Sequence, residues 1–141
     1  MKAVAVTDVA ALPDPPYPAD TKAKGLRWRV DYERLNQSTT WAKAPAELKP
    51  WLLMSWYVAW QQIPCGSFEG DQQVIAAKIG MPWVMWQHHQ EVMLRGWYRC
   101  SDGRFYHPVI AEDVLKMTKW RHAERQERYI VRAIAKRNER A

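Results

Sequence analysis

The chain has 141 residues, of which 48% are hydrophobic and 26% charged, and its formal net charge is +6. This length suits one domain with a core, and the composition excludes a chain that is disordered throughout. No apolar stretch approaches the length of a membrane span, and the apolar run at the N-terminus is too short for a signal peptide. We therefore expect a globular cytoplasmic protein that makes no membrane contact.

The first part of the chain is predicted to be extended. Residues 1–25 are rich in proline, which favours a flexible lead-in with little to bury. Residues 26–32 alternate apolar and polar side chains, with Leu26, Trp28 and Val30 on one side. This period of two predicts a half-buried strand.

A helix is predicted over residues 46–62, where apolar side chains recur at spacings of three and four. The residues before it, 32–44, are rich in turn and capping types and predict an irregular link or a short helix. The run Ile63-Pro-Cys-Gly-Ser ends the main helix.

Two further helices follow, separated by a tight turn. The first covers residues 72–79, with Asp71 as its N-cap and Gly80 as its C-terminal stop. The second begins at Trp83, after a proline suited to a first helical position, and extends to about Arg95.

A β-hairpin and a long helix complete the chain. Asp102-Gly103 favours a hairpin turn over residues 97–107, and residues 111–141 predict one charged helix, or two separated by a bend. Residues 116–141 contain nine basic and three acidic side chains, whereas residues 1–115 contain twelve of each. Such a concentration of charge attracts polyanions, and a solvated helix face is the alternative explanation.

Together these elements predict a mainly α-helical protein with a small antiparallel sheet. Two helices joined by a tight turn and followed by a hairpin are typical of a winged helix-turn-helix, and the strand at 26–32 would complete the sheet. The predicted organisation is a flexible N-terminal segment (1–25), a winged-helix domain (26–110) and a basic C-terminal helix (111–141).

Several stretches resemble a group of phage and prophage proteins of unknown function, the YdaU-like family. They are Pro16-Tyr-Pro-Ala-Asp, Trp51-Leu-Leu-Met-Ser-Trp-Tyr-Val-Ala-Trp-Gln-Gln-Ile-Pro-Cys-Gly-Ser-Phe, Arg95-Gly-Trp and Asp102-Gly-Arg-Phe-Tyr-His. The resemblance covers most of residues 16–122. It implies a winged-helix fold and an association with phage-type replication initiation, through DNA or through a replicative helicase. It supplies no catalytic or binding residues.

In a winged helix, the second helix of the pair enters the major groove and the hairpin contacts the DNA backbone. On helix 83–95 we expect the inward side to be covered by Val84, Trp86 or Gln87, and the later Val92, Met93 and Leu94. We expect Gln87, His88, Gln90 and Glu91 to lie largely on the outer side, where glutamine can bond adenine. Basic side chains would contact phosphates. They are Arg95, Arg99 and Arg104 at the hairpin, Arg27 and Arg29 on the first strand, and Lys119, Arg121, Arg125 and Arg128 on the last helix.

A protein-interaction module is the alternative, for example an adaptor or inhibitor that contacts a replicative helicase. Nine tryptophans and a helix 83–95 with almost no basic residues favour it. Tyr129, Ile130 and Ile134 would let the last helix dock on a partner or form a homodimer. An exposed tryptophan cluster would favour this alternative, and a continuous basic face from hairpin to C-terminal helix would favour DNA.

The reactive side chains do not form a recognisable catalytic or metal-binding pattern. Cys65 and Cys100 lack metal spacing and are expected to be reduced thiols. The adjacent His88 and His89 diverge on a helix and lack ligand partners one turn away. Cys100 and His107 could meet across the hairpin, but no third group is placed to orient them. We expect no metal, no cofactor and no enzymatic activity.

Overall fold

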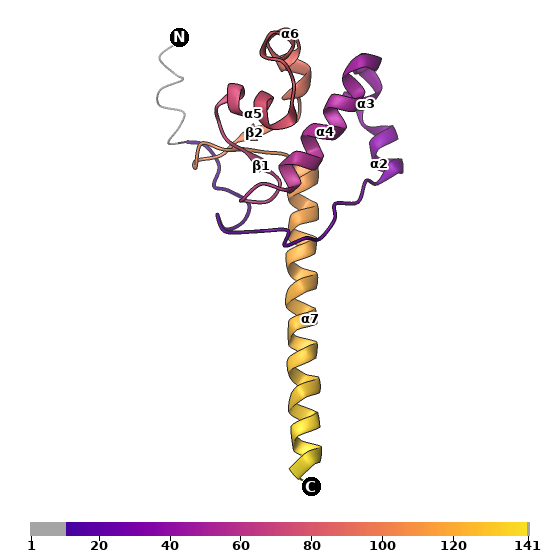
Figure 1. Cartoon of the computed structure of the whole chain (residues 1–141), viewed down its shortest axis with the longest axis vertical. Coiled ribbons are helices and arrows are strands. Elements are labelled where there is room, and N and C mark those ends of the chain that lie inside the picture. The colour runs from indigo at the N-terminus through magenta and orange to yellow at the C-terminus, as the bar shows by residue number, and fades with distance from the viewer. Residues whose placement is uncertain (1–10, 141) are drawn as a thin grey trace.

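The computed structural model describes residues 11–140. The chain is mainly helical with a small three-stranded antiparallel sheet, as predicted, and Figure 1 shows how the elements are arranged. Residues 1–10 of the predicted flexible segment and Ala141 of the predicted last helix lie outside the described residues. The elements are α2 (Tyr32–Gln37), α3 (Thr39–Lys43), the 3-10 helix η1 (Ala46–Leu48), α4 (Lys49–Trp60), β1 (Ser67–Phe68), α5 (Gln72–Ile79), α6 (Trp83–Met93), β2 (Tyr98–Arg99), β3 (Phe105–Tyr106) and α7 (Pro108–Arg140).

The sheet has the strand order β1-β3-β2, and its third strand is not the one predicted. Tyr98 and Arg99 pair with Tyr106 and Phe105, which confirms the hairpin, but β1 supplies the other edge. Residues 26–31 form no strand. Their exposure does alternate, because Trp28 packs on α4 and its indole N–H donates to Asp113 Oδ2 at 3.0 Å. Side chains of α4 and α7 therefore cover this segment, and no neighbouring strand is needed.

The link before α4 contains two short helices, which settles the alternative that the sequence left open. Asp31 Oδ1 accepts from the backbone N–H of Arg34, and Ser38 Oγ accepts from that of Trp41. These side chains satisfy donors that helix N-termini leave without partners. The helix predicted over 46–62 begins as η1 and continues as α4, with Pro50 in its first turn.

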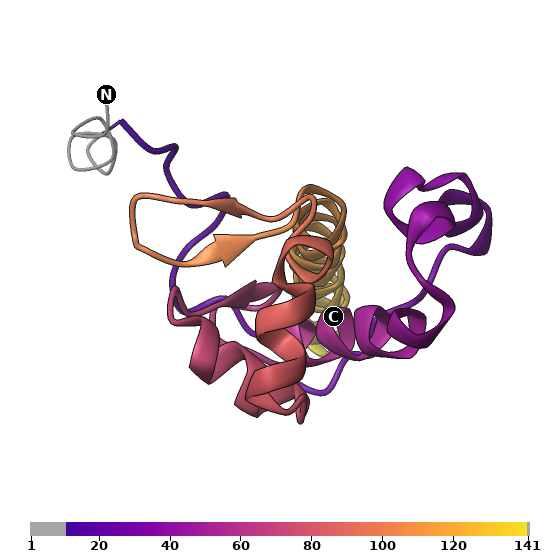
Figure 2. The same cartoon turned by 90° about the horizontal axis from the view of Figure 1, so that it is seen from above.

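The helix α5 has the predicted boundaries and caps, and α6 begins at the predicted Trp83 but ends at Met93, two residues before the predicted end. Asp71 Oδ1 accepts from the backbone N–H of Gln73 at 2.9 Å, and α5 ends at Gly80 with φ +81. An L-residue rarely adopts this left-handed conformation, so glycine allows the chain to reverse there. In Figure 2 the hairpin lies to one side of the α7 axis, and α2 and α3 lie to the other.

The proline-rich segment contacts the domain at Tyr17. This side chain is 7% exposed and donates its hydroxyl proton to the Cys65 carbonyl, and it is the one buried residue among 11–25, as expected for a segment with little to bury. Gly66 makes this packing possible. A Cβ there would lie 2.8 Å from Tyr17 Oη and 2.9 Å from Ile110 Cγ2.

α4 and the first turns of α7 supply much of the core. α7 begins at Pro108, three residues before the predicted start, and buries Ile110, Ala111, Val114 and Met117. It is one continuous helix to Arg140. No helix among residues 11–140 has the length and apolar character needed to cross a membrane.

Candidate nucleic-acid interface

The outward face of α6 carries the side chains predicted to contact bases. Gln87, His88 and Gln90 are exposed, as the helical period predicts. The prediction that Val84 faces inward is wrong, because 66% of it is exposed. The inward placement of Trp86 is confirmed, because it is 1% exposed and its indole N–H donates to Gln72 Oε1 of α5 at 2.8 Å. This contact fixes which face of α6 turns outward.

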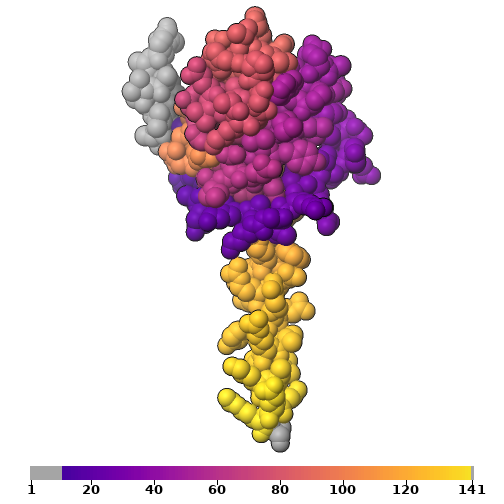
Figure 3. Space-filling model, in the orientation of Figure 1, coloured from indigo at the N-terminus to yellow at the C-terminus, as the bar shows by residue number. Residues whose placement is uncertain are grey.

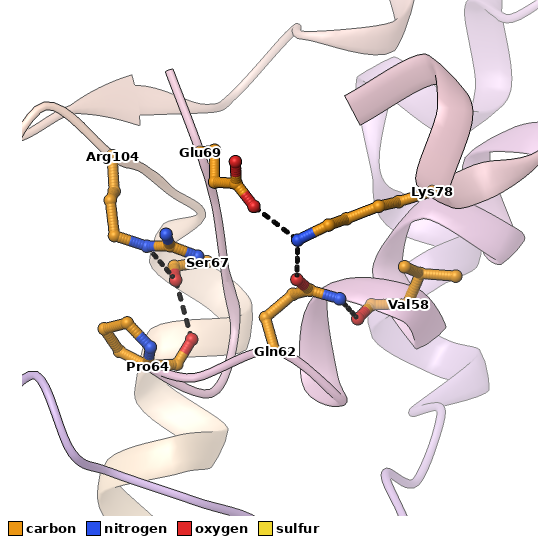
Figure 4. A network of polar contacts seen from close by, with 7 residues as sticks. All are labelled: Val58, Gln62, Pro64, Ser67, Glu69, Lys78 and Arg104. Carbon is orange, nitrogen blue, oxygen red and sulfur yellow. Dashed lines mark hydrogen bonds and ion pairs between the residues drawn. The ribbon is translucent and has the colours of Figure 1, made fainter. Parts of the chain in front are cut away.

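Two arginines beside α6 are already engaged within the protein. Arg104 Nε donates to Ser67 Oγ at 2.8 Å, and that hydroxyl donates to the Pro64 carbonyl (Figure 4). Arg99 donates to the Gly70 carbonyl at 3.2 Å, and its guanidinium lies 4.9 Å from the centroid of the Phe105 ring. Arg95 is exposed. A phosphate would have to compete with the protein's own acceptors for Arg99 and Arg104.

The surface around α6 and the hairpin has no net charge. Lys78 pairs with Glu69 and donates to Gln62 Oε1 at 2.8 Å (Figure 4). Residues 69–104 contain four basic side chains, Lys78, Arg95, Arg99 and Arg104, against four acidic ones, Glu69, Asp71, Glu91 and Asp102. The attraction that dominates DNA affinity is therefore weak at this end of the molecule.

The positive charge is concentrated where α7 leaves the domain. We call residues 118–140 of α7 the stem, because none of them is buried and every residue from 125 onward is exposed. The stem rises about 1.5 Å per residue, or about 35 Å in all, and Figure 3 shows it protruding from the domain. Its basic side chains outnumber its acidic ones by eight to three.

Most of these stem cations have no carboxylate partner. Arg128 pairs with Glu124 at 3.4 Å. Within residues 11–140, no ion pair involves the six others on the exposed surface, which are Lys119, Arg125, Arg132, Lys136, Arg137 and Arg140. Of the predicted residues on the stem, Lys119 and Arg125 are therefore both exposed and unpaired.

Arg121 has a structural role that the sequence did not indicate. It donates to the carbonyls of Lys22 and Ala23, the latter at 2.8 Å, and it is only partly exposed. Its Nε is buried without a hydrogen-bond partner among the described residues. Arg121 thus attaches the segment 22–25 to α7 and is a poor candidate for direct phosphate contact.

Residues 22–29 bring a second group of cations to the base of the stem. Arg27 and Arg29 are exposed, although no strand presents them. Together with Lys116 of α7 they line a groove beside Trp28 and Trp120. Sequence reasoning missed Lys22 and Lys24, yet residues 21–30 hold four basic and no acidic side chains. A local charge count could have identified them.

The twelve predicted residues therefore fall into two groups. Gln87, His88, Gln90, Arg95, Arg99 and Arg104 surround α6, and Arg27, Arg29, Lys119, Arg121, Arg125 and Arg128 lie on or beside α7. Figure 1 shows α6 at the end of the molecule opposite the C-terminus of α7. All six members of the second group are basic, whereas the first group combines three arginines with amide and imidazole side chains.

Most of the tryptophans lie in or against the core. Trp83 on α6 is 37% exposed and Trp120 on the stem is 51% exposed, while the other seven are buried or half-buried. Since the two exposed rings lie on different elements, they do not form the tryptophan cluster that would favour a protein partner.

The buried titratable groups have structural roles. Burial, with a smaller contribution from the Arg34 guanidinium, lowers the pKa of His107 to about 4. Its Nδ1 accepts from the backbone N–H of Val109 at 3.3 Å, at the start of α7. Burial raises the pKa of Cys65 to about 12, which keeps this thiol protonated and unreactive at neutral pH. Among residues 11–140, no three metal-ligating side chains gather around one point.

Comparison with known proteins finds no family model, no curated protein and no solved structure that matches this chain.

Proposed function

We propose that the protein binds DNA, chiefly through phosphate contacts made by the stem and by residues 22–29. The observation that carries the proposal is the row of stem cations that have neither a carboxylate partner nor a neighbouring element. Phosphate attraction depends on charge more than on detailed geometry, so a basic helix without fixed side-chain partners is suited to it.

The stability of the stem supports a role in binding. Most helical stability in proteins comes from tertiary packing. None of residues 118–140 is buried, and the pair Glu124–Arg128 is exposed and contributes little. A polyanion along the stem would neutralise the repulsion between its cations and stabilise the helix.

The exposed face of α6 has a secondary role in this proposal. Gln87 and Gln90 could bond base edges in a major groove, and His88 could donate to a base or a phosphate. The resemblance to phage and prophage proteins suggests replication initiation in the cytoplasm as the setting. The winged-helix interpretation, the absence of catalysis and the absence of a cofactor belong to the same proposal.

The test is fluorescence anisotropy with a labelled duplex at increasing salt. Each phosphate contact contributes about 0.9 to the slope of log K against log salt concentration. Replacing Arg125 and Arg132 by glutamine should reduce that slope by about 2. The matched control replaces Arg95 and Arg99 by glutamine and should leave it nearly unchanged. The proposal would be contradicted if only the Arg95 and Arg99 variant reduced the salt slope, or if the wild type did not bind the duplex at low salt.

One observation favours the protein-interaction alternative. Tyr129, Ile130, Val131 and Ile134 are exposed large apolar side chains on the stem. They could pack on a helicase, another protein or a second copy of the chain. Absence of DNA binding, together with concentration-dependent self-association in analytical ultracentrifugation, would favour a homodimer over DNA binding.

A further inference from the structure

Two grooves flank the segment 22–29 where it crosses the base of the stem. One, of about 520 Å³, lies between this segment and α7 and is lined by Leu26, Arg27, Trp28, Arg29, Trp60, Asp113, Lys116, Met117 and Trp120. The other, of about 660 Å³, lies on the α4 side and reaches Tyr57, Lys22 and Lys24. Leu26, Arg27, Trp28 and Trp60 line both grooves, so the two hollows adjoin. We call the pair the basal grooves.

Hydrogen bonds fix the walls of the basal grooves. Trp60 Nε1 donates to the Leu26 carbonyl at 2.7 Å, and Trp28 Nε1 donates to Asp113 Oδ2 at 3.0 Å. Arg121 attaches the other end of the segment to α7 through the Lys22 and Ala23 carbonyls. Because the indole N–H groups are satisfied inside the protein, what the rings offer a ligand is their apolar surface.

Two aromatic rings at the basal grooves are open to solvent. Trp120 is 51% exposed and Tyr57 is 43% exposed. The half-buried Trp28 packs edge-to-face against Tyr57, with ring centroids 5.1 Å apart. The Tyr57 ring is thus held in place by Trp28, and basic side chains lie along the same grooves.

The charge around these rings is positive. Lys22, Lys24, Arg27, Arg29 and Lys116 line the basal grooves, and Asp113 is the one acidic side chain among their lining residues. Its carboxylate already accepts the Trp28 N–H. Lys116 pairs with Glu112 at 3.3 Å, whereas the other four cations enter no ion pair among the described residues. Exposed rings beside such cations are typical of surfaces that hold a nucleic-acid backbone by charge and its unpaired bases by stacking.

We propose that the basal grooves bind single-stranded nucleic acid, with bases stacked on Trp120 and Tyr57 and phosphates held by Arg27 and Arg29. This inference rests on the proposed function and adds a preference for unpaired strands. In a duplex the base faces are already stacked on one another, so Trp120 can add little to duplex binding. A single strand presents those faces to the rings.

The test compares three labelled probes of about 15 nucleotides, a length near the upper site size of one ssDNA-binding module. They are oligothymidine, an abasic strand with the same phosphates, and a duplex. The variants are Trp120→Ala, Trp120→Phe and, as matched control, Trp83→Ala at the other exposed tryptophan. Trp120 lies on the stem surface, so its removal leaves the core intact, and circular dichroism verifies this.

Trp120→Ala should weaken oligothymidine binding by about fivefold or more, since stacking on one ring contributes about 1–3 kcal/mol per base. Binding of the abasic strand and the duplex should change by less than about twofold, because the phosphate contacts remain. Trp120→Phe should restore part of the loss, and Trp83→Ala should behave as wild type.

Equal affinity of wild type and Trp120→Ala for oligothymidine would overturn the inference. So would an equal loss on the abasic strand, or binding of polyglutamate as tight as that of oligothymidine, because charge alone would then explain the contacts. In each case, salt-dependent duplex binding by the wild type would still support the proposed function. Failure of the wild type to bind the duplex, the abasic strand and oligothymidine would instead refute the proposed function.

Discussion

His107 makes the stability of this domain depend on pH in a predictable direction. Its ring lies between Trp56 and Trp97, with centroid distances of 6.3 and 5.3 Å, and burial with the nearby Arg34 charge lowers its pKa from 6.5 to about 4. Between these two pH values the unfolded chain binds more protons than the folded one, so stability falls as the pH falls.

The size of the effect follows from the two pKa values. A difference between 6.5 and about 4 corresponds to about 3 kcal/mol of unfolding free energy. This contribution is fully present above 6.5 and is lost as the pH falls through about 4. In a domain of this size it equals a change of about 10 °C in Tm.

The assay is urea denaturation of the wild type and of His107→Gln at several pH values, together with an NMR titration of the histidine rings. The raised pKa of Asp113, caused first by burial, acts in the opposite direction, and the difference between the two proteins cancels it. We expect the wild type to lose about 3 kcal/mol more than the variant between neutral pH and pH ~4. A His107 ring that titrates near 6.5, or parallel pH profiles, would refute the reasoning.

Three substitutions test the local structure. Gly66→Ala should destabilise the domain by about 2–5 kcal/mol in urea denaturation, because φ is +78 and the new Cβ would meet Tyr17. Gly25→Ala is its matched control, since φ is +81 but nothing lies within 4 Å, and an equal loss in both would contradict the packing argument. Asp71→Ala should cost about 1 kcal/mol by removing the α5 N-cap, with Asp71→Asn nearly neutral, and equal losses would exclude the capping role. Arg121→Met should speed tryptic cleavage after Lys22, because the segment loses its attachment to α7, and unchanged cleavage would argue against that attachment.

The elements predicted correctly are those specified by local chemistry. Asp71 and Gly80 mark the two ends of α5, and Asp102-Gly103 marks the hairpin turn, because capping and turn geometry depend on a few adjacent residues. The prediction of a strand at 26–32 was wrong. Alternating polarity shows which side of a segment is covered, but it does not show whether a neighbouring strand or side chains from helices cover that side. β1 has two residues, too few for any periodicity, and only its pairing with β3 defines it.

The candidate site likewise combines features that can be counted in the sequence with features that depend on the fold. The excess of lysine and arginine after residue 116 can be counted in the sequence, as can the shortage of charge on helix 83–95. That Arg99 and Arg104 are engaged within the domain, and that Arg121 bonds two carbonyls of the N-terminal segment, depends on residues far away in the chain. Their availability to a ligand therefore could not be predicted from their residue type.

The sequence by itself determined the helix pair, the hairpin and the position of the charge along the chain, because hydrophobic period, caps and composition are local properties. The tertiary structure alone decided that the charged stem lies away from α6 and that the segment 22–29 joins it at two aromatic-lined grooves. The physical reason is that contacts such as Trp28–Asp113 and Trp60–Leu26 join residues with no regular relation in sequence, and packing of the whole chain selects them.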